Sequence, residues 1–333
     1  MMHNSEKIDF VILWVDSNDP KWQEVYKKYK SIENGDQREF RFRDMDTLRF
    51  WFRGIENNAP WVNNVFFITN GQFPNWLNLN HPKLRFVKHS DYIPSEYLPT
   101  FSSHTIELNL HRIKDLSENF VYFNDDTFLI NPAKQTDFFK GGYPKLCAIM
   151  DSNVTRDYPP FLVPHVNASV LNRNFEKKDV LKHNFTKFFN LSYKQFLLKN
   201  IQFSFGRGFY GFKMYHLPAP MLKSTIEEVW EKEEDILHTT CSHRFRQQND
   251  VNQWLFQNWQ ICKGDFFPQR YDIGSFIPIQ STNDLKRACD EIQNSSKLFV
   301  CPNDASGVDF YKVKKELHKA LNEKFPNKSS YEL

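Results

Sequence analysis

Four short apolar runs, separated by helical segments, constrain the fold of the first 131 residues most strongly. The runs are typical of buried strands and lie at residues 8–15, 65–69, 84–88 and 120–123. Helical patterns separate them at residues 21–31, at residues 42–57, after Pro74 and in the first part of residues 100–131. Strands and helices that alternate in this way predict a mostly parallel sheet with helices on both faces. We therefore predict an α/β, Rossmann-like fold.

The second half of the chain is less regular and mostly helical in pattern. Several prolines in residues 141–171 predict an insertion or rim, and residues 175–202 predict helices rich in Phe and Lys. Residues 223–234 predict an acidic helix, and residues 243–262 begin polar and continue as an amphipathic helix. A terminal helix and a tail are expected from residue 307 onward.

The fourth apolar run ends in Asn124-Asp125-Asp126. In open α/β sheets, ligands bind at the carboxyl ends of the strands, which is where these three residues would lie. Two adjacent carboxylates repel each other unless a cation or a phosphate-bound metal lies between them. A solvated Asp-Asp turn is the alternative interpretation, and the pair alone does not decide between the two.

The helical segment before this strand carries His104, Glu107 and His111 on one face, since they are spaced i, i+3 and i+7. This spacing also raises the possibility of a zinc site. Catalytic zinc sites usually need three protein ligands of suitable geometry. No third ligand of that kind is apparent beside the two histidines, so we do not favour zinc here.

Composition and charge exclude several classes of protein. A formal net charge of +3 and a pI near 8.4 are too mild to indicate nucleic-acid binding, although they permit an anionic ligand or a loose contact with a membrane surface. The five cysteines lack CxxC spacing, and we expect them to be reduced. The sequence shows neither a secretory signal nor the roughly 20 consecutive apolar residues of a membrane span. We expect a cytoplasmic protein.

The loop after the first strand, Asp16-Ser17-Asn18-Asp19-Pro20, has the layout of a nucleotide cradle. The chain lacks both GxGxxG and GxxxxGK[ST] at this place. It therefore carries neither the dinucleotide fingerprint nor a P-loop.

Four sequence blocks resemble the Stealth family of sugar-phosphate transferases, which act in microbial capsule synthesis and in the tagging of lysosomal enzymes. The first block is IDFVILWVDSNDP at residues 8–20, and the second runs from RFRDMDTLRFWF to NFVYFNDDTFL at residues 41–129. The third is HLPAP at residues 216–220, and the fourth is HRFRQQNDVNQWLFQNW at residues 243–259. Together they cover somewhat over a third of the chain, and the second block is the most specific.

The resemblance implies four catalytic residues: Glu107, Asp126, His216 and Arg246. His165, in PHVNASVLNR, is an alternative for the histidine role. From the residues alone, Glu107 could be a surface charge and His216 a core histidine. Arg246 could equally belong to a solvated basic cluster.

The same resemblance places nucleotide-sugar contacts in the first loop, at Asp16 and Asp19. Further candidate substrate contacts in the second block are Arg43, Asn70 and Asn124. Asp126, together with Asp125, would hold Mg²⁺ or Mn²⁺ on the diphosphate, since hard cations take carboxylate oxygens.

The implied reaction transfers a hexose 1-phosphate from a UDP-sugar to an acceptor hydroxyl and releases UMP, in capsule or exopolysaccharide synthesis. Arg246 would bind phosphate through its planar guanidinium. Either Glu107 or His216 would be the general base, and the sequence does not choose between them. The alternatives are a metal-dependent glycosyltransferase that releases UDP and a non-catalytic sugar-binding subunit.

We expect three stretches that form one catalytic unit. Residues 1–140 would bind the nucleotide-sugar, residues 141–205 would form a helical insertion or acceptor-side rim, and residues 206–333 would supply the second catalytic part. The expected partners are a UDP-sugar and a saccharide or lipid-linked saccharide, with no nucleic acid. A peripheral contact at the inner face of the membrane is compatible with the sequence, and the sequence leaves the oligomeric state open.

Overall fold

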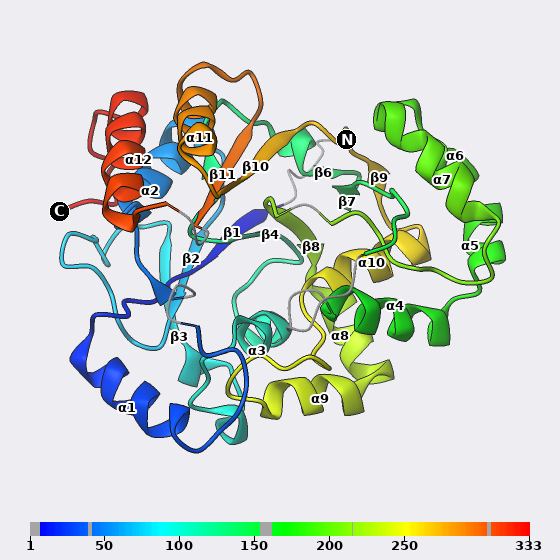
Figure 1. The fold of residues 1–333 in the computed structure, drawn as a ribbon, viewed down its shortest axis with the longest axis horizontal. Helices are drawn as coiled ribbons and strands as arrows, with labels where there is room; N and C mark the ends of the chain where they lie inside the picture. Colours follow the sequence, from blue (N-terminus) through cyan, green and yellow to red (C-terminus); the bar gives the residue numbers. More distant parts are fainter. Residues whose placement is uncertain (1–6, 39–41, 154–161, 215, 305–307) are drawn as a thin grey trace.

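A five-stranded sheet in the order β3-β2-β1-β4-β8 lies at the centre of the computed structural model (Figure 1). The structure describes residues 7–38, 42–153, 162–214, 216–304 and 308–333. Four strands are parallel, and they are β1 (Ile8–Leu13), β2 (Val65–Thr69), β3 (Leu84–Lys88) and β4 (Asn119–Phe123). The edge strand β8 (Ala219–Leu222) runs antiparallel to β4. The predicted Rossmann-like α/β fold with a mostly parallel sheet is confirmed.

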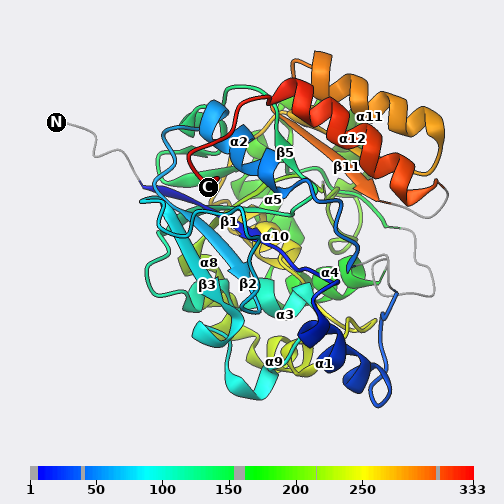
Figure 2. The same cartoon turned by 90° about the vertical axis from the view of Figure 1, so that its left-hand side faces the viewer.

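The central strands β1, β2 and β4 are mostly apolar because both faces of the sheet are covered. Side chains alternate between the two faces, so Phe10 and Ile12 of β1 enter one hydrophobic cluster while Val11 enters another. The first cluster includes α2 (Leu48–Asn58), α11 (Thr282–Asn294) and α12 (Phe310–Lys324), which lie together in Figure 2. The second cluster includes α8 (Lys223–Lys232) and α10 (Trp254–Lys263).

The remaining helices lie mainly in the second half of the chain, as predicted. They are α1 (Pro20–Lys30), α3 (Ser103–Leu108), α4 (Val163–Asn174), α5 (Lys177–His183), α6 (Phe185–Phe188), α7 (Leu197–Ser204) and α9 (Glu234–Ser242). Within the described ranges, no helix is long and apolar enough to cross a membrane. The five cysteines are all free of disulfides.

Two smaller sheets join distant segments. One contains β10 (Gly274–Ile279), β11 (Phe299–Asp304) and β5 (Phe128–Leu129), and the other contains β6 (Phe139–Lys140), β7 (Tyr143–Leu146) and β9 (Phe267–Pro268). In the first of these sheets, β11 pairs antiparallel with β5, which begins two residues after Asp126. Strands from residues 206–333 therefore pair with strands from both earlier stretches, while the division into three functional parts stays a prediction.

The helix predicted at residues 42–57 begins later, at Leu48. The side chain of Asp44 accepts a hydrogen bond from the backbone N–H of Asp46 at 2.7 Å, and Asp46 has a φ of 56°. This Asx-type turn competes with the helical hydrogen-bond pattern, so the first part of the predicted helix is a loop.

The helix predicted after Pro74 is also wrong. Leu77 instead forms an antiparallel bridge with Glu332, and the backbone N–H of Asn78 donates to the carbonyl oxygen of Tyr331 at 2.8 Å. Residues 331 and 332 thus pair with the segment after Pro74, and the helical pattern of the local sequence does not predict this contact. The first strand is shorter than predicted as well, since β1 ends at Leu13.

Candidate active site

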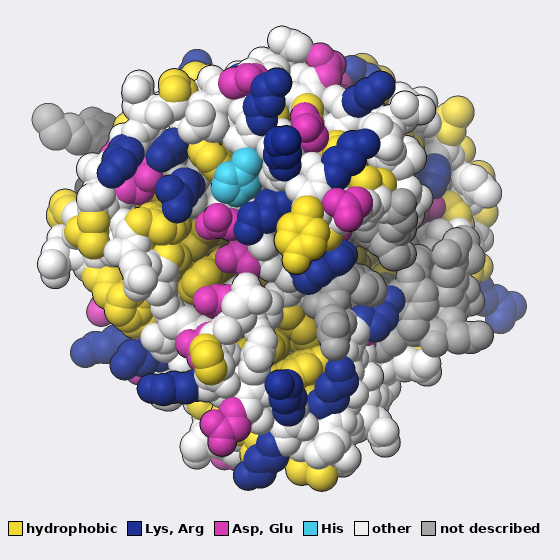
Figure 3. Space-filling view, turned by 60° about the vertical axis from the view of Figure 1, so that its left-hand side comes forward, with side chains coloured by type: hydrophobic (Ala, Val, Ile, Leu, Met, Phe, Trp, Pro, Cys, Tyr) yellow, Lys and Arg dark blue, Asp and Glu magenta, His cyan; other side chains and the backbone are white. Residues whose placement is uncertain are grey.

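A cavity of about 590 Å³ lies beyond the carboxyl ends of β1 and β4. All four candidate catalytic residues line it, together with Arg43, Asn124 and Asp125. Figure 3 shows acidic side chains gathered along the hollow of this face, with lysine and arginine side chains around it. The sheet therefore brings together residues that lie far apart in the sequence.

The carboxylate of Asp126 is held between two other elements. Its Oδ1 lies 3.5 Å from Nε2 of His216, and its Oδ2 accepts a hydrogen bond from Nδ2 of Asn303 at 2.7 Å. His216 reaches this position because β8 begins shortly after it and runs antiparallel to β4, so that Ala219 pairs with Tyr122. Asn303 arrives through β11, which pairs with the strand that follows Asp126.

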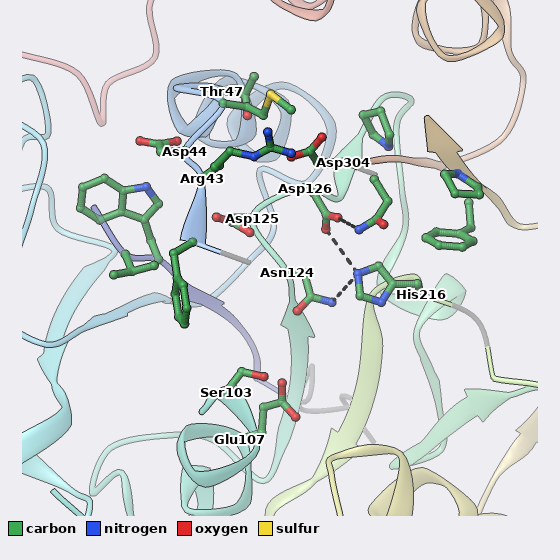
Figure 4. A pocket seen from close by; sticks show the side chains of 18 of the residues that line it. Arg43, Asp44, Thr47, Ser103, Glu107, Asn124, Asp125, Asp126, His216 and Asp304 are labelled. Carbon is green, nitrogen blue, oxygen red and sulfur yellow. Dashed lines mark hydrogen bonds and ion pairs between the residues drawn. The ribbon is translucent and has the colours of Figure 1, made fainter. Parts of the chain in front are cut away.

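The imidazole of His216 contacts a donor and an acceptor through the same nitrogen (Figure 4). Nε2 lies 3.4 Å from Nδ2 of Asn124 as well as 3.5 Å from Asp126. A neutral Nε2 accepts from Asn124, whereas a protonated Nε2 donates to Asp126. Burial alone would lower the pKa of His216, but the charge of Asp126 and its hydrogen bond outweigh burial and raise the pKa above its usual value.

The two adjacent carboxylates differ in environment. Burial, followed by the charges of Asp126 and Asp44, raises the pKa of Asp125 to about 7. Burial acts in the same direction on Asp126, but the positive charge of His216 and the hydrogen bonds from His216 and Asn303 hold its pKa below the usual value. In Figure 4 the carboxylate of Asp125 points away from that of Asp126. Asp126 is therefore the carboxylate of the pair that stays ionised at neutral pH.

Glu107 lies on α3 and is buried, with only 5% of its surface exposed. The Tyr122 hydroxyl lies 3.1 Å from Glu107 Oε1 and 2.9 Å from Asn124 Oδ1, and the backbone N–H of Gln253 lies 3.4 Å from Glu107 Oε2. Burial and the charge of Glu107 raise the pKa of Tyr122 well above its usual value, so Tyr122 remains a hydrogen-bond donor. Glu107 is thus not a surface charge of the helix.

Arg246 reaches the cavity from the loop before α10, and its Nη2 donates to Oγ of Ser103 at 2.7 Å. Buried Asp250 fixes this loop because it accepts hydrogen bonds from Nδ1 of His104 at 2.9 Å and Nδ1 of His243 at 2.7 Å. His104 therefore positions the loop that carries Arg246. This contact accounts for one of the two histidines predicted to share a helix face with Glu107. The other, His111, lies beyond the end of α3 at Leu108.

The predicted substrate contacts are distributed over a wider area. Arg43 lines the cavity and forms a 2.6 Å ion pair with Asp304 at the end of β11. Asn70 lines an adjoining cavity of about 160 Å³, which shares Trp14, Asn124 and Arg246 with the larger one.

Asp16 and Asp19 line neither of these two cavities. The side chain of Asp19 caps the amino end of α1 by accepting from Lys21 and Trp22, and the backbone N–H of Asp16 donates to the side chain of Gln72. His165, the alternative to His216, lies on α4 and is not among the residues that line either cavity.

Three residues could hold a metal ion: Asp126, His216 and Cys301, whose potential ligand atoms all lie within 4.8 Å of one another. Carboxylate and imidazole are ordinary ligands of divalent transition metals, whereas a purely oxygen-based set favours Mg²⁺. Burial raises the pKa of the Cys301 thiol well above its usual value, which makes it the weakest ligand of the three. Asp125 is not in this group, and its predicted contact with a cation stays a prediction.

Comparison with known proteins decides the family. The model of Stealth protein conserved region 1 matches residues 6–33, and that of conserved region 2 matches residues 41–146. The capsular polysaccharide phosphotransferase WcwK of Streptococcus pneumoniae is 42% identical, over 99% of this chain and 99% of its own length. The chain belongs to the Stealth family. This confirms the resemblance carried by the sequence blocks.

Two further relatives are similar to this chain. The receptor polysaccharide phosphotransferase WefC of Streptococcus gordonii is 38% identical over 98% of this chain and 99% of its own length. The capsular polysaccharide phosphotransferase eps5J of Streptococcus thermophilus is 47% identical over 62% of this chain and 89% of its own length. The two matched Stealth regions include Glu107 and Asp126, while His216 and Arg246 lie outside them and join the cavity through the fold.

Several residues of this candidate site were not predicted from the sequence. Tyr122 is hidden within an apolar strand, although a buried tyrosine hydroxyl usually needs a polar partner. Cys301, Asn303 and Asp304 end β11, and the sequence FVCPND repeats the pattern of an apolar run followed by Asn and Asp that marked VYFNDD. That repeated pattern is the signal that could have found them.

Proposed function

We propose that this Stealth-family enzyme transfers a hexose 1-phosphate from a UDP-sugar to a hydroxyl of an acceptor saccharide, in capsule or exopolysaccharide synthesis. The observation that carries the proposal is the convergence of Glu107, Asp126, His216 and Arg246 on one cavity from four separate segments. The phosphotransferase names of the relatives support the same reaction class.

The proposed step is attack at phosphorus. A bond forms between the acceptor oxygen and the β-phosphorus, and the bond from that phosphorus to the oxygen shared with the α-phosphate breaks. The products are a phosphodiester and UMP, and the hydroxyl proton passes to a base on the enzyme. Catalysis of this kind depends on positioning and on neutralising charge at the phosphoryl oxygens. Arg246 suits the second task because its guanidinium can donate two parallel hydrogen bonds to phosphate.

We assign the proton acceptor to His216. About a third of its side chain, 32%, is exposed, and Nε2 lies between Asn124 and Asp126. Glu107 is more deeply buried and already contacts the Tyr122 hydroxyl and a backbone N–H through its two oxygens. Glu107 then orients Tyr122 and Asn124 and contributes negative charge near the imidazole.

Asp126 fits the role of holding a divalent cation, Mn²⁺ or Mg²⁺, through a carboxylate that stays ionised. When bound, such a cation supplies positive charge for the diphosphate oxygens. A His216 nitrogen that ligates a cation has no lone pair left for a proton. Its roles as ligand and base therefore exclude each other, and ligation by His216 would pass the base role to Glu107.

The acceptor in this proposal is a saccharide, either free or linked to a lipid. The reaction would take place in the cytoplasm, with peripheral contact at the inner face of the membrane.

The experiment is to identify the nucleotide that purified enzyme releases from a panel of UDP-sugars, with Mn²⁺ or Mg²⁺ and an acceptor saccharide. UMP that depends on the acceptor is the expected product. UDP would indicate a glycosyltransferase, and UMP without any acceptor would indicate a phosphodiesterase. Asp126→Asn should abolish release, while Asp115→Asn, an exposed acid outside the cavity, should leave it unchanged.

To test the assignment of the base, Mn²⁺ binding is measured with His216→Gln. Binding close to that of the unaltered enzyme, combined with loss of UMP release, supports His216 as the base. Loss of Mn²⁺ binding would identify His216 as a ligand.

A further inference from the structure

Helix α7 (Leu197–Ser204) exposes its apolar side chains and buries a polar one. Leu198, Ile201 and Phe205 are spaced i, i+3 and i+7, and they are 70%, 45% and 85% exposed. Phe205 directly follows α7 and keeps a helical backbone conformation, so the three side chains lie along one face. We call these three residues the α7 stripe. Single exposed apolar residues are common on protein surfaces, but a stripe of large apolar side chains along one helix is typical of a surface that contacts another protein, a membrane or a ligand.

The buried side of α7 explains why the helix is held in this orientation. Asn200 is fully buried, and its amide donates to the carbonyl oxygens of Ala148 at 2.8 Å and Phe188 at 2.5 Å. Its Oδ1 accepts from the backbone N–H of Met150 at 2.6 Å. Rotation of the helix to bury the stripe would leave these polar groups without partners, which is costly. The outward orientation of the stripe is therefore fixed.

The charged side chains of the sequence around α7, residues 182–214, are all basic. Residues 182–214 contain no Asp or Glu, and they contain six cationic residues, Lys182, Lys187, Lys194, Lys199, Arg207 and Lys213. Lys194 and Lys199 are paired with acids from outside the segment, Asp272 and Asp151, and Lys187 donates to the carbonyl oxygen of Gly264. Lys213 lies over the ring of Phe196, while Lys182 and Arg207 are exposed. Leu191 and Phe185, also in this segment, are 83% and 60% exposed. An apolar stripe within a basic segment is complementary to an anionic surface that has an apolar interior.

We propose that the α7 stripe docks on a membrane surface rich in anionic lipid. The stripe would enter the boundary between headgroups and acyl chains, and exposed Lys182 and Arg207 would lie against the headgroups. Figure 1 shows α6 and α7 at the outer edge of the molecule, on the opposite side from α1, where a flat surface can reach them. A second copy of the chain fits less well, because a symmetric interface would place this basic, acid-free segment against itself.

This contact gives the proposed peripheral localisation a specific surface. It concerns binding to lipid alone, and it can be measured without a UDP-sugar or an acceptor. Loss of vesicle binding and absence of UMP release are consequently separate results, and either proposal can fail without the other.

The experiment is flotation of the full chain with vesicles of equal parts phosphatidylglycerol and phosphatidylcholine, compared with vesicles of phosphatidylcholine alone. We expect binding to the first and little to the second, and binding that weakens as salt is raised. The double variant Leu198→Ser, Phe205→Ser should lower the partition coefficient about tenfold or more, because each residue loses an apolar contact with the bilayer. Lys182→Gln together with Arg207→Gln should also lower it.

Tyr311→Ser is the matched control, since Tyr311 is an apolar residue on α12 that is 77% exposed. It should bind vesicles as the unaltered chain does. Circular dichroism and thermal unfolding establish that each variant is folded. Unchanged partition of the double variant, equal binding to both kinds of vesicle, or a dimer that dissociates on Leu198→Ser, Phe205→Ser without any vesicle binding would overturn the proposal.

Discussion

Nε2 of His216 and Oδ1 of Asp126 lie 3.5 Å apart. Asp126 follows the parallel strand β4, and His216 precedes β8, which runs antiparallel to β4. This contact requires β8 to pair with β4 in the observed register. It joins a residue of the matched Stealth regions to one outside them. The chemistry of the site therefore depends on the edge strand of the central sheet.

The first prediction concerns the charge of Asp126. Asp126→Asn should lower kcat for UMP release by a factor of about 100 or more, as is usual when an electrostatic contact in an active site is removed. It should also lower the pKa of His216, because the carboxylate is what raises that pKa. NMR titration of the His216 ring measures the shift, and a pKa that stays unchanged would contradict the described contact.

The second prediction concerns Asn303, which positions Asp126 through a 2.7 Å hydrogen bond. Asn303→Ala should lower kcat about tenfold with a smaller change in KM, because the carboxylate of Asp126 would no longer be held in a single orientation. Asn303→Asp should be more harmful, since it places like charges together. Steady-state kinetics test both variants, with exposed Asn283→Ala on α11 as the control. Equal rates for Asn303→Ala and the control would rule out the positioning role.

The parallel sheet was predictable because its central strands β1, β2 and β4 are buried on both faces and are mostly apolar in sequence. Asn124 to Asp126 could likewise be placed at a strand end from local sequence alone. The pattern FVCPND could mark Asn303 and Cys301 as candidates at a strand end, but their position beside Asp126 was not predictable, because the pairing of β11 with β5 joins segments far apart in the chain. The loop before Leu48 and the segment after Pro74 were mispredicted because an Asx-type turn and a contact with the tail override helical periodicity.

A third prediction concerns stability at low pH. Burial alone would raise the pKa of Asp250, but the hydrogen bonds from His104 and His243 outweigh burial and hold it below the usual value. A carboxyl whose pKa is lower in the folded state stabilises the fold above its unfolded pKa of about 3.9. This contribution is lost as the pH falls through the folded pKa. The free energy of unfolding of Asp250→Asn should be lower than that of the unaltered chain near neutral pH and should fall less steeply in acid. Identical slopes for the two proteins would refute the assignment.

A fourth prediction concerns the tail. Arg53 and Glu332 form a buried ion pair with two hydrogen bonds of 2.7 and 2.8 Å, and Arg53 also donates to the carbonyl oxygen of Phe325. Glu332→Ala should lower the free energy of unfolding by about 3 kcal/mol or more, because it leaves a buried guanidinium without its partner. Lys232→Ala breaks an exposed pair with Glu228 and should cost about 1 kcal/mol or less. Denaturant titration measures both, and equal losses would argue against a special role for the tail.

The fate of the β-phosphorus distinguishes transfer of a sugar phosphate from transfer of the sugar alone. The purified enzyme is incubated with a UDP-sugar that carries a radioactive β-phosphorus, a divalent cation and an acceptor saccharide, and the products are separated. We expect the label to move to the acceptor in a phosphodiester, while the released UMP is unlabelled. Label that remains in released UDP would show attack at the sugar carbon and would contradict the proposed phosphotransfer.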